Sequence, residues 1–434
     1  MAMTIDPAAA SSSDPLPGEG DGTHVNAPDL QLFVFALFFI FGGITSLNDV
    51  LIPKLKELFT LNYFQAMLVQ SAFFAAYFFV SLPAAAIVKR AGYMRTASIG
   101  LLTMMAGCLL FIPAASSATF GMFLVALFVL AAGITIVQVV ANPLISLLGA
   151  PQTAHSRLTF AQAFNSLGTT IFPWVGSILI LGTLATVDPA TLSGAALAAY
   201  RAEEAQVIVN TYLGLAAALA IVAIVVFARR NRLQDVHDRS GSVLASFALL
   251  RRPRFGFGAA CIFLYVGAEV AIGSLIVNYL MEADVLALPE QVAGQHVPLY
   301  WGGALVGRFI GAGVLRVVSP GKVLAAVATA AIVLIAISAN STGAVAGYSL
   351  LAVGLANAIM FPTIFSLASE GLGRRAADGS GIICMAIVGG AVIPPLTGGL
   401  ADASGSLAFA LVVPAACYAV IGGFGLFARR RATA

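Results

Sequence analysis

The chain has 434 residues, of which 60% are hydrophobic and 9% are charged, and its net charge is +3. Soluble globular domains carry about 25% charged residues, so the composition excludes a soluble protein and predicts an all-α membrane protein that crosses the bilayer many times. The four cysteines lie in apolar segments, where we expect them to be packing residues rather than paired or reactive thiols.

Residues 1–29 are polar, rich in Pro, Gly and Ser, and contain no Lys or Arg. We expect a disordered cytoplasmic tail here, because the segment has neither the apolar residues of a core nor the basic region of a secretory signal. Twelve apolar segments follow, each long enough for the ~20 residues of a membrane-spanning helix. Their approximate limits are 30–58, 63–88, 95–114, 118–142, 155–182, 204–228, 254–281, 294–316, 321–338, 343–369, 377–400 and 405–428.

The basic residues lie mainly on one side of the predicted membrane. Of the 22 Lys and Arg residues, 18 fall in alternate loops and at the C-terminal end, whereas the opposite loops hold only Lys54, Lys56 and Arg201. Cytoplasmic loops are enriched in Lys and Arg, so we expect both termini in the cytoplasm. The predicted segments are then a six-helix bundle over 30–228, a cytoplasmic linker with a surface helix over 229–253, a second six-helix bundle over 254–428, and a basic cytoplasmic tail over 429–434.

The two predicted bundles repeat one pattern at a separation of about 220 residues. The repeated pairs are Asp49 and Glu269, Gln138 and Asn357, Pro143 and Pro362, Arg157 and Arg375, and Pro173 and Pro394. Two parallel repeats of six helices, with a substrate site between them near the middle of the bilayer, are the arrangement of major facilitator transporters. The pattern therefore predicts that fold.

Away from the ends of the predicted spans, the charged residues that need an explanation are Asp49, Glu269 and Arg308. Each costs about 2.5–3.5 kcal/mol on insertion scales, so each needs a reason. We expect Asp49 and Glu269 to face a central cavity and to exchange a coupling ion there; an interfacial Asp49 and a structurally paired Glu269 are the alternatives. For Arg308 we expect a gating or structural contact, or a side chain that reaches the interface.

Carboxamides and hydroxyls recur at helical spacing in two spans. Thr135, Gln138 and Asn142 share one face of the fourth span, and Thr159, Gln162, Asn165 and Thr169 share one face of the fifth. Carboxamides both donate and accept hydrogen bonds, as sugar hydroxyls require; ordinary contacts between helices are the alternative. The aromatic residues that could stack on a sugar are Tyr77, Trp174, Tyr265, Tyr300 and Trp301.

The sequence holds no phosphate-binding loop, no HExxH or CxxC pair and no Ser/His/Asp arrangement. We therefore expect neither an enzyme nor an ATP-driven pump, and we expect no cofactor and no nucleic-acid partner. None of the four histidines occupies the centre of a predicted span. A carboxylate, rather than a histidine, must then carry any transported proton, since burial raises the pKa of a carboxyl group.

The segments SLNDVLIPKLKELFTLNYFQAMLVQSAFFAAYF, ANPLISLLG, RLTFAQAFNSLGTTI, YVGAEVAIGSLIVNYL, YWGGALVGRFIGA and FPTIFSLA resemble the fucose–galactose–glucose–proton symporter family of the major facilitator superfamily. GITIVQVVANP and GAEVAIGSLIVNYL are more similar to its glucose/galactose branch. The resemblance implies a sugar symporter of a bacterial inner membrane. It implies that Asp49 is the protonation site and that Gln162 and Asn165 bind sugar.

One position departs from that family pattern. The L-fucose symporters have a glutamate where this chain has Gln138, so a two-carboxylate relay through that position cannot operate here. Glu269, where those symporters have an amide, would compensate, or a sodium ion near Asp49 would replace the proton.

Our prediction is a monomeric transporter that imports a hexose by alternating access, coupled to a proton. The alternatives are sodium coupling, an uncoupled sugar facilitator or exporter, a sugar-sensing receptor and a drug antiporter. We expect the ion to bind Asp49 and Glu269. We expect gating or structural contacts from Arg308, Arg157 and Arg375. The expected sugar-binding residues are Asn48, Gln138, Asn142, Gln162, Asn165, Glu269, Asn278, Trp301 and Asn357.

Overall fold

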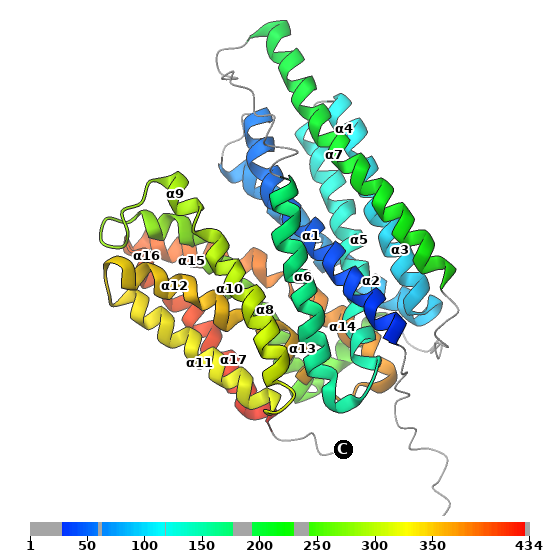
Figure 1. Cartoon of the computed structure of the whole chain (residues 1–434), viewed down its shortest axis with the longest axis vertical. Coiled ribbons are helices and arrows are strands. Elements are labelled where there is room, and N and C mark those ends of the chain that lie inside the picture. The colour runs from blue at the N-terminus through cyan, green and yellow to red at the C-terminus, as the bar shows by residue number, and fades with distance from the viewer. Residues whose placement is uncertain (1–27, 60–62, 118, 177–192, 230–242, 430–434) are drawn as a thin grey trace, which may run out of the picture.

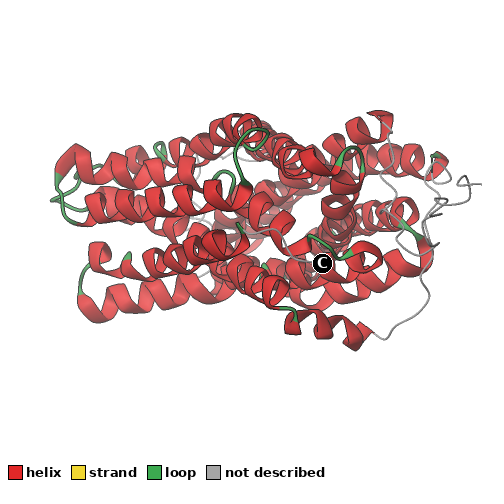
Figure 2. Cartoon of the chain, turned by 90° about the horizontal axis from the view of Figure 1, so that it is seen from below, coloured by secondary structure: helices red, strands yellow, loops and turns green. Residues whose placement is uncertain are grey.

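The computed structural model describes residues 28–59, 63–117, 119–176, 193–229 and 243–429. Within these ranges every regular element is a helix (Figure 2). Nearly all of the expected N-terminal tail, half of the expected linker and most of the expected C-terminal tail lie outside them.

The described residues of the first bundle form seven α-helices. These are α1 (Pro28–Phe59), α2 (Tyr63–Ala91), α3 (Tyr93–Leu109), α4 (Phe111–Ser117), α5 (Phe120–Leu147), α6 (Ala154–Gly176) and α7 (Gly194–Ala228), with a short 3₁₀-helix, η1 (Pro151–Thr153), before α6. Within it, α1 packs on α6, α2 on α5, and α3 on α5 and α7.

The second bundle contains ten α-helices. These are α8 (Pro253–Met281), α9 (Glu290–Gly294), α10 (Val297–Val314), α11 (Pro320–Ala339), α12 (Gly343–Asn357), α13 (Met360–Ser369), α14 (Ala376–Ala386), α15 (Gly389–Ser404), α16 (Leu407–Ala410) and α17 (Val412–Ala428), with η5 (Gly373–Arg375) before α14. Here α8 packs on α15 and α17, α10 on α12, and α11 on α12 and α17.

Ten stretches of these helices, some joining two consecutive elements, are long and apolar enough to cross a bilayer. The other two expected spans are α6 and α10. Neither holds a stretch as apolar as the other ten, since α6 carries the row of hydroxyl and amide side chains, and α10 carries Arg308 among several glycines. Over their described residues the twelve expected spans are thus helical, and the chain is a multi-pass membrane protein.

Several spans are not single continuous helices. The segment expected over 343–369 is α12 followed by α13, with Ala358 and Ile359 between them, and the segment over 377–400 divides into α14 and α15. By contrast α5 runs unbroken through Pro143. A break in a membrane helix frees carbonyl groups, which other groups must then satisfy.

The two bundles are joined at the end of the molecule that carries the chain termini. There Lys89 Nζ lies 2.9 Å from Asp378 Oδ1 and His155 Nε2 lies 3.0 Å from Glu370 Oε1. The Ser380 hydroxyl also donates to the carbonyl of Val139, over 2.9 Å. Toward the opposite end the bundles diverge: Figure 1 shows α4 and the first turns of α7 well apart from α9 and α16. The described part of the molecule is therefore closed at the terminal end.

A short segment of the expected linker reinforces this closure. Residues Val243–Arg251 form a 3₁₀-helix, η4, which packs on α8 and α14. Its Leu249 is fully buried, and its Ser246 hydroxyl donates to Asp378 Oδ1 over 2.9 Å. The expected surface helix is thus present, but one side of it is packed against the second bundle.

Candidate functional site

A polar network surrounds Glu269 in the middle of the second bundle. The Tyr265 hydroxyl lies 2.8 Å from Glu269 Oε1 and 3.1 Å from the carbonyl oxygen of Asn357. The Tyr300 hydroxyl donates to the Glu269 carbonyl over 3.2 Å and accepts from Asn357 Nδ2 over 2.8 Å. Tyr265, Tyr300 and Asn357 are buried, whereas Glu269 is partly exposed. Glu269 Oε2 accepts no hydrogen bond from the described residues, so this oxygen is available to an ion or a ligand.

The break between α12 and α13 supplies part of this network. Asn357 is the last residue of α12, and its carbonyl accepts from Tyr265. The next carbonyl, that of Ala358, accepts from Arg308 Nε over 3.1 Å. Both freed carbonyls thus receive side-chain donors, which is why the interrupted helix is tolerated at membrane depth.

Arg308 also reaches the first bundle. One of its terminal nitrogens, NH1, donates to the carbonyl of Gln162 over 3.1 Å and to the hydroxyl of Ser166, both on α6. Arg308 is close enough to Glu269 for an electrostatic interaction. The expected gating or structural contact therefore has a geometry: the guanidinium ties α6 of one bundle to the broken helix of the other.

The two carboxamides of α6, Asn165 and Gln162, differ in their hydrogen bonding. Asn165 Nδ2 donates to the carbonyl of Phe38 in α1, over 3.3 Å. The helices approach closely there, and a Cβ atom on Gly42 would lie 2.3 Å from Asn165 Nδ2. Gln162 is 6% exposed, and its side chain makes no hydrogen bond within the described residues. Gln162 can therefore offer its whole carboxamide to a ligand.

The first bundle has a smaller polar cluster of its own. Gln138 Nε2 donates to the Tyr77 hydroxyl over 3.1 Å, and Thr45 of α1 lies beside that hydroxyl. One turn further along α5, Asn142 is 1% exposed, next to the thiol of Cys384. Neither side-chain polar atom of Asn142 has a hydrogen-bond partner in the parts of the chain described here. A buried amide without partners is costly, which makes it a candidate for ligand contact.

The remaining expected site residues lie elsewhere or outside the description. Trp301 is 40% exposed and packs on α8 at Gly273, one turn beyond Glu269, where an added Cβ would lie 3.1 Å from its ring. Asn278 is exposed near the end of α8. Asn48 and Asp49 belong to α1, but their side chains lie outside the described residues, as does that of Trp174 in α6. A sodium site near Asp49 falls outside them too.

Arg157 and Arg375 lie at the terminal end rather than at the polar network. Arg157 donates to the carbonyls of Ser146 and Ala150, over 2.9 and 2.6 Å, and so satisfies carbonyl groups at the C-terminal end of α5 and in the turn that follows. Arg375 donates to the carbonyl of Ala245 in η4 over 2.9 Å. Both side chains hold loops in place.

Three of the aromatic residues that were expected to stack on a sugar are buried and act as hydrogen-bonding groups instead. Stacking on a sugar needs an accessible ring, but Tyr77, Tyr265 and Tyr300 are 3%, 1% and 1% exposed. Their hydroxyls instead organise Gln138, Glu269 and Asn357. The expectation of stacking is wrong for these three rings; Trp301 remains a candidate, and the side chain of Trp174 lies outside the described residues. The spacing of four between Tyr265 and Glu269 is the signal that could have indicated their hydrogen bond.

Sequence comparison and fold comparison agree. A model of the Major Facilitator Superfamily matches residues 33–394. The glucose/galactose transporter of Brucella abortus is 48% identical over 392 residues, which cover 90% of this chain and 92% of that protein. The L-fucose-proton symporter of Escherichia coli is 36% identical over 410 residues, 92% of each chain.

Among solved structures, the chain is similar to FucP, described as a major facilitator transporter in the outward conformation. The TM-score is 0.84 at 33% identity, over 93% of this chain and 99% of that one. A bacterial homologue of the iron transporter ferroportin shares only the fold, with a TM-score of 0.72 at 13% identity.

Proposed function

The chain belongs to the major facilitator superfamily, a superfamily of transporters rather than enzymes, and from this premise we propose that it imports a hexose by cation-coupled symport, with the proton as the coupling ion. The single observation that carries the substrate class is the 48% identity to a glucose/galactose transporter over 90% of this chain. The polar groups described above support the same proposal.

We propose that the sugar binds between the Glu269 network and α6. Glu269 Oε2 and the Gln162 carboxamide are both uncommitted among the described residues, and Arg308, which donates to the Gln162 carbonyl, lies close enough to Glu269 for an electrostatic interaction. Asn142 would add a donor and an acceptor, and Trp301 an accessible ring, whose flat face suits the apolar side of a pyranose. Gln138, Asn165, Asn357, Asn48 and Asn278 remain proposed contacts of lower priority, because the first three already bond protein groups, Asn48 is undescribed and Asn278 is remote.

We propose that the coupling ion binds to the carboxylates of Asp49 and Glu269. They occupy matching places in the two bundles, and an ionised carboxylate at membrane depth costs about 2.5–3.5 kcal/mol unless it is neutralised. A proton that neutralises the carboxylate when the site changes sides would couple uptake to the proton gradient. Gln138 cannot take part in proton transfer, since a carboxamide does not titrate in this range.

The closed terminal end supports alternating access from a state open to the other side. The bias of Lys and Arg supports a cytoplasmic position for that end. The same state is named for the similar FucP structure. Import would then require the contacts of Arg308, Lys89 and His155 between the bundles to break.

The test is uptake of radiolabelled D-glucose, D-galactose and L-fucose into proteoliposomes, with proton and sodium gradients imposed separately. We expect uphill accumulation of glucose or galactose that follows the proton gradient. Accumulation that follows sodium alone would reject proton coupling, and equilibration without accumulation would identify a facilitator. Failure of all three sugars to enter would reject the hexose substrate.

A single substitution separates coupling from binding. Asp49→Asn is expected to abolish uphill accumulation while exchange of labelled for unlabelled sugar continues, because the amide cannot carry a proton. The matched control is Asp402→Asn, which changes an exposed carboxylate near the end of α15 and is expected to leave accumulation unchanged. Normal accumulation by Asp49→Asn would exclude Asp49 from coupling.

A further inference from the structure

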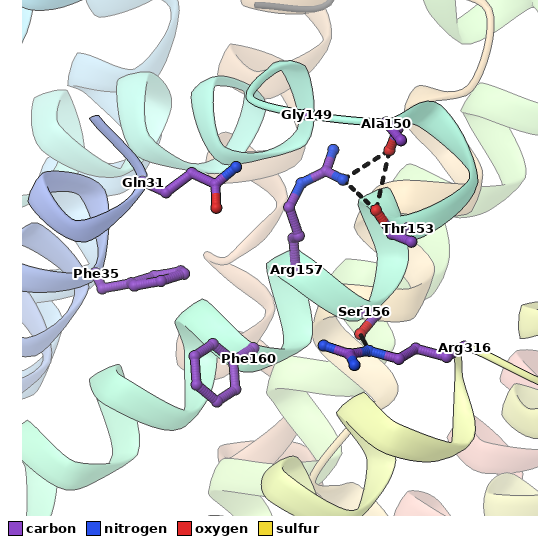
Figure 3. A pocket seen from close by; sticks show the side chains of 9 residues that line it. All are labelled: Gln31, Phe35, Gly149, Ala150, Thr153, Ser156, Arg157, Phe160 and Arg316. Atoms are coloured by element: carbon purple, nitrogen blue, oxygen red, sulfur yellow. Dashed lines mark hydrogen bonds between the residues drawn. The ribbon is translucent and has the colours of Figure 1, made fainter. Parts of the chain in front are cut away.

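A pocket of about 420 Å³ opens at the terminal end of the molecule, between α1, the turn before α6, α6 itself and the residue Arg316 just beyond α10 (Figure 3). It is separate from the polar network around Glu269. It lies where the two bundles meet, because α1 and α6 belong to the first bundle and Arg316 to the second.

Two guanidinium groups line this pocket without an acidic partner. Arg157 donates only to neutral groups, three carbonyls and the Thr153 hydroxyl. Arg316 Nε donates to the Ser156 hydroxyl over 3.3 Å, and its other nitrogens make no hydrogen bond within the described ranges. Other bases at the same end, including Lys89 and Arg254, are paired with carboxylates. The pocket therefore holds two positive charges that no described protein group compensates.

The wall of the pocket becomes apolar toward the centre of the membrane. Phe35 follows Gln31 by four residues in α1, and Phe160 follows Arg157 by three in α6. Their ring centroids are 5.3 Å apart, edge to face, and Phe160 lies 6.0 Å from Phe309 of α10. Phe160 and Phe309 are 37% and 47% exposed, although both lie inside membrane-spanning helices. Rings exposed in this way on two expected membrane spans are suited to contact with acyl chains.

We propose that this pocket binds one anionic glycerophospholipid of the cytoplasmic leaflet. Its phosphate would lie between Arg157 and Arg316, which supply charge-assisted donors. An acyl chain would run from there along Phe160 and Phe309. A basic pocket between helices on the cytoplasmic side is the kind of site that anionic headgroups occupy. A soluble anion would use the guanidinium groups alone and would leave the exposed rings unexplained.

The lipid would favour the closed state of the terminal end. The two guanidinium groups come from different bundles, and the bundles touch beside them, since the Ser156 hydroxyl donates to the carbonyl of Ala312 over 2.7 Å. Opening of this end would draw Arg157 and Arg316 apart and divide the site. A ligand that binds one state better shifts the equilibrium toward it.

The test is native mass spectrometry of the purified full chain with phosphatidylglycerol and with phosphatidylcholine of identical acyl chains. We expect one phosphatidylglycerol to be retained more tightly than phosphatidylcholine. Arg316→Gln should weaken phosphatidylglycerol binding about fivefold and leave phosphatidylcholine unchanged. Arg316 is the better target, because Arg157 also satisfies a carbonyl group at the C-terminal end of α5. Arg95→Gln, which removes an exposed arginine of α3 at the same end, is the matched control and should leave binding unchanged.

Two further arms identify the source of the anion. Phe160→Ala should weaken phosphatidylglycerol, and soluble glycerol 3-phosphate should fail to compete with it. Competition by glycerol 3-phosphate at comparable concentration would overturn the lipid assignment in favour of a soluble anion. Equal affinity for the two lipids, or equal losses in Arg316→Gln and Arg95→Gln, would overturn the proposal altogether. None of these outcomes depends on which sugar is transported.

Discussion

Each bundle contains a hydrogen bond from a carboxamide to a tyrosine hydroxyl, but the helix that carries the carboxamide is continuous in one bundle and interrupted in the other. In the first bundle Gln138 of α5 donates to Tyr77 of α2, and in the second Asn357 of α12 donates to Tyr300 of α10. The helix around Gln138 continues unbroken through Pro143, whereas the helix of Asn357 stops there and restarts at Met360.

The interruption changes what the second bundle can do. Two carbonyls are freed at Asn357 and Ala358, and they are satisfied by Tyr265 and Arg308. In the first bundle α5 is unbroken at the matching place and frees no such groups there; it carries Asn142, whose amide has no hydrogen-bond partner among the described residues. The two copies of the repeat thus keep polar residues at matching positions. Only the second bundle carries Arg308 beside these residues, where it bonds groups of both bundles.

The largest effect should come from Arg308, whose side chain donates hydrogen bonds to groups of both bundles. Arg308→Gln is expected to lower sugar uptake about a hundredfold, because a hydrogen bond to a charged group contributes about 1.5–3 kcal/mol and Arg308 makes such bonds to both bundles. Uptake into proteoliposomes measures it. Lys322→Gln removes an exposed charge and serves as the control. Near-normal uptake by Arg308→Gln would show that the second bundle does not depend on its bridge.

The next effect should come from Tyr265, whose hydroxyl contacts Glu269 and the freed carbonyl of Asn357. Tyr265→Phe should raise the KM for sugar about tenfold, the equivalent of about 1.4 kcal/mol, with a smaller change in maximal rate. Tyr279→Phe is the matched control, since its hydroxyl bonds Ser338 at the far end of the same helix. Equal KM values for the two variants would mean that Tyr265 does not position Glu269 for the substrate.

Much of this architecture could be predicted from the sequence, and the reasons for the rest are physical. The lengths of the apolar segments predict twelve spans, although α6 and α10 are less apolar than the other ten, and the repeat predicts the fold. The break at Ala358 could not be predicted, because Pro143 and Pro362 occupy matching places and only one of the two helices breaks. Nor could the contacts of Arg308, since they join α10 to an α6 residue 146 positions away.

A third prediction asks whether the bundles share their packing as well as their polar pattern. Gly168 and Gly389 are 221 residues apart, and an added Cβ would lie 2.1 Å from the carbonyl of Phe39 in one case and 1.9 Å from that of Phe263 in the other. A backbone carbonyl cannot move aside as a flexible side chain can. Gly168→Ala and Gly389→Ala should therefore each lower the free energy of unfolding by about 1–3 kcal/mol.

Thermal unfolding in detergent measures this effect for both glycines. Gly398→Ala, where the added Cβ would meet nothing within 4 Å, is the control and should unfold at the temperature of the unaltered protein. Destabilisation of only one of the two variants would show that the close approach of α1 to α6 has no equivalent between α8 and α15.

The smallest expected effect concerns Asn142, a polar position that is apolar in the second bundle. Asn142 precedes Pro143, and the residue that precedes Pro362 is Phe361. Because the buried amide of Asn142 has no hydrogen-bond partner among the described residues, Asn142→Leu should stabilise the sugar-free protein by about 1 kcal/mol, visible as a higher unfolding temperature. If the amide binds sugar, the variant should also lose part of the stabilisation that added glucose or galactose gives the unaltered protein. A lower unfolding temperature without sugar would instead show that Asn142 supports the bundle, and the two bundles would then differ in packing rather than in ligand contact.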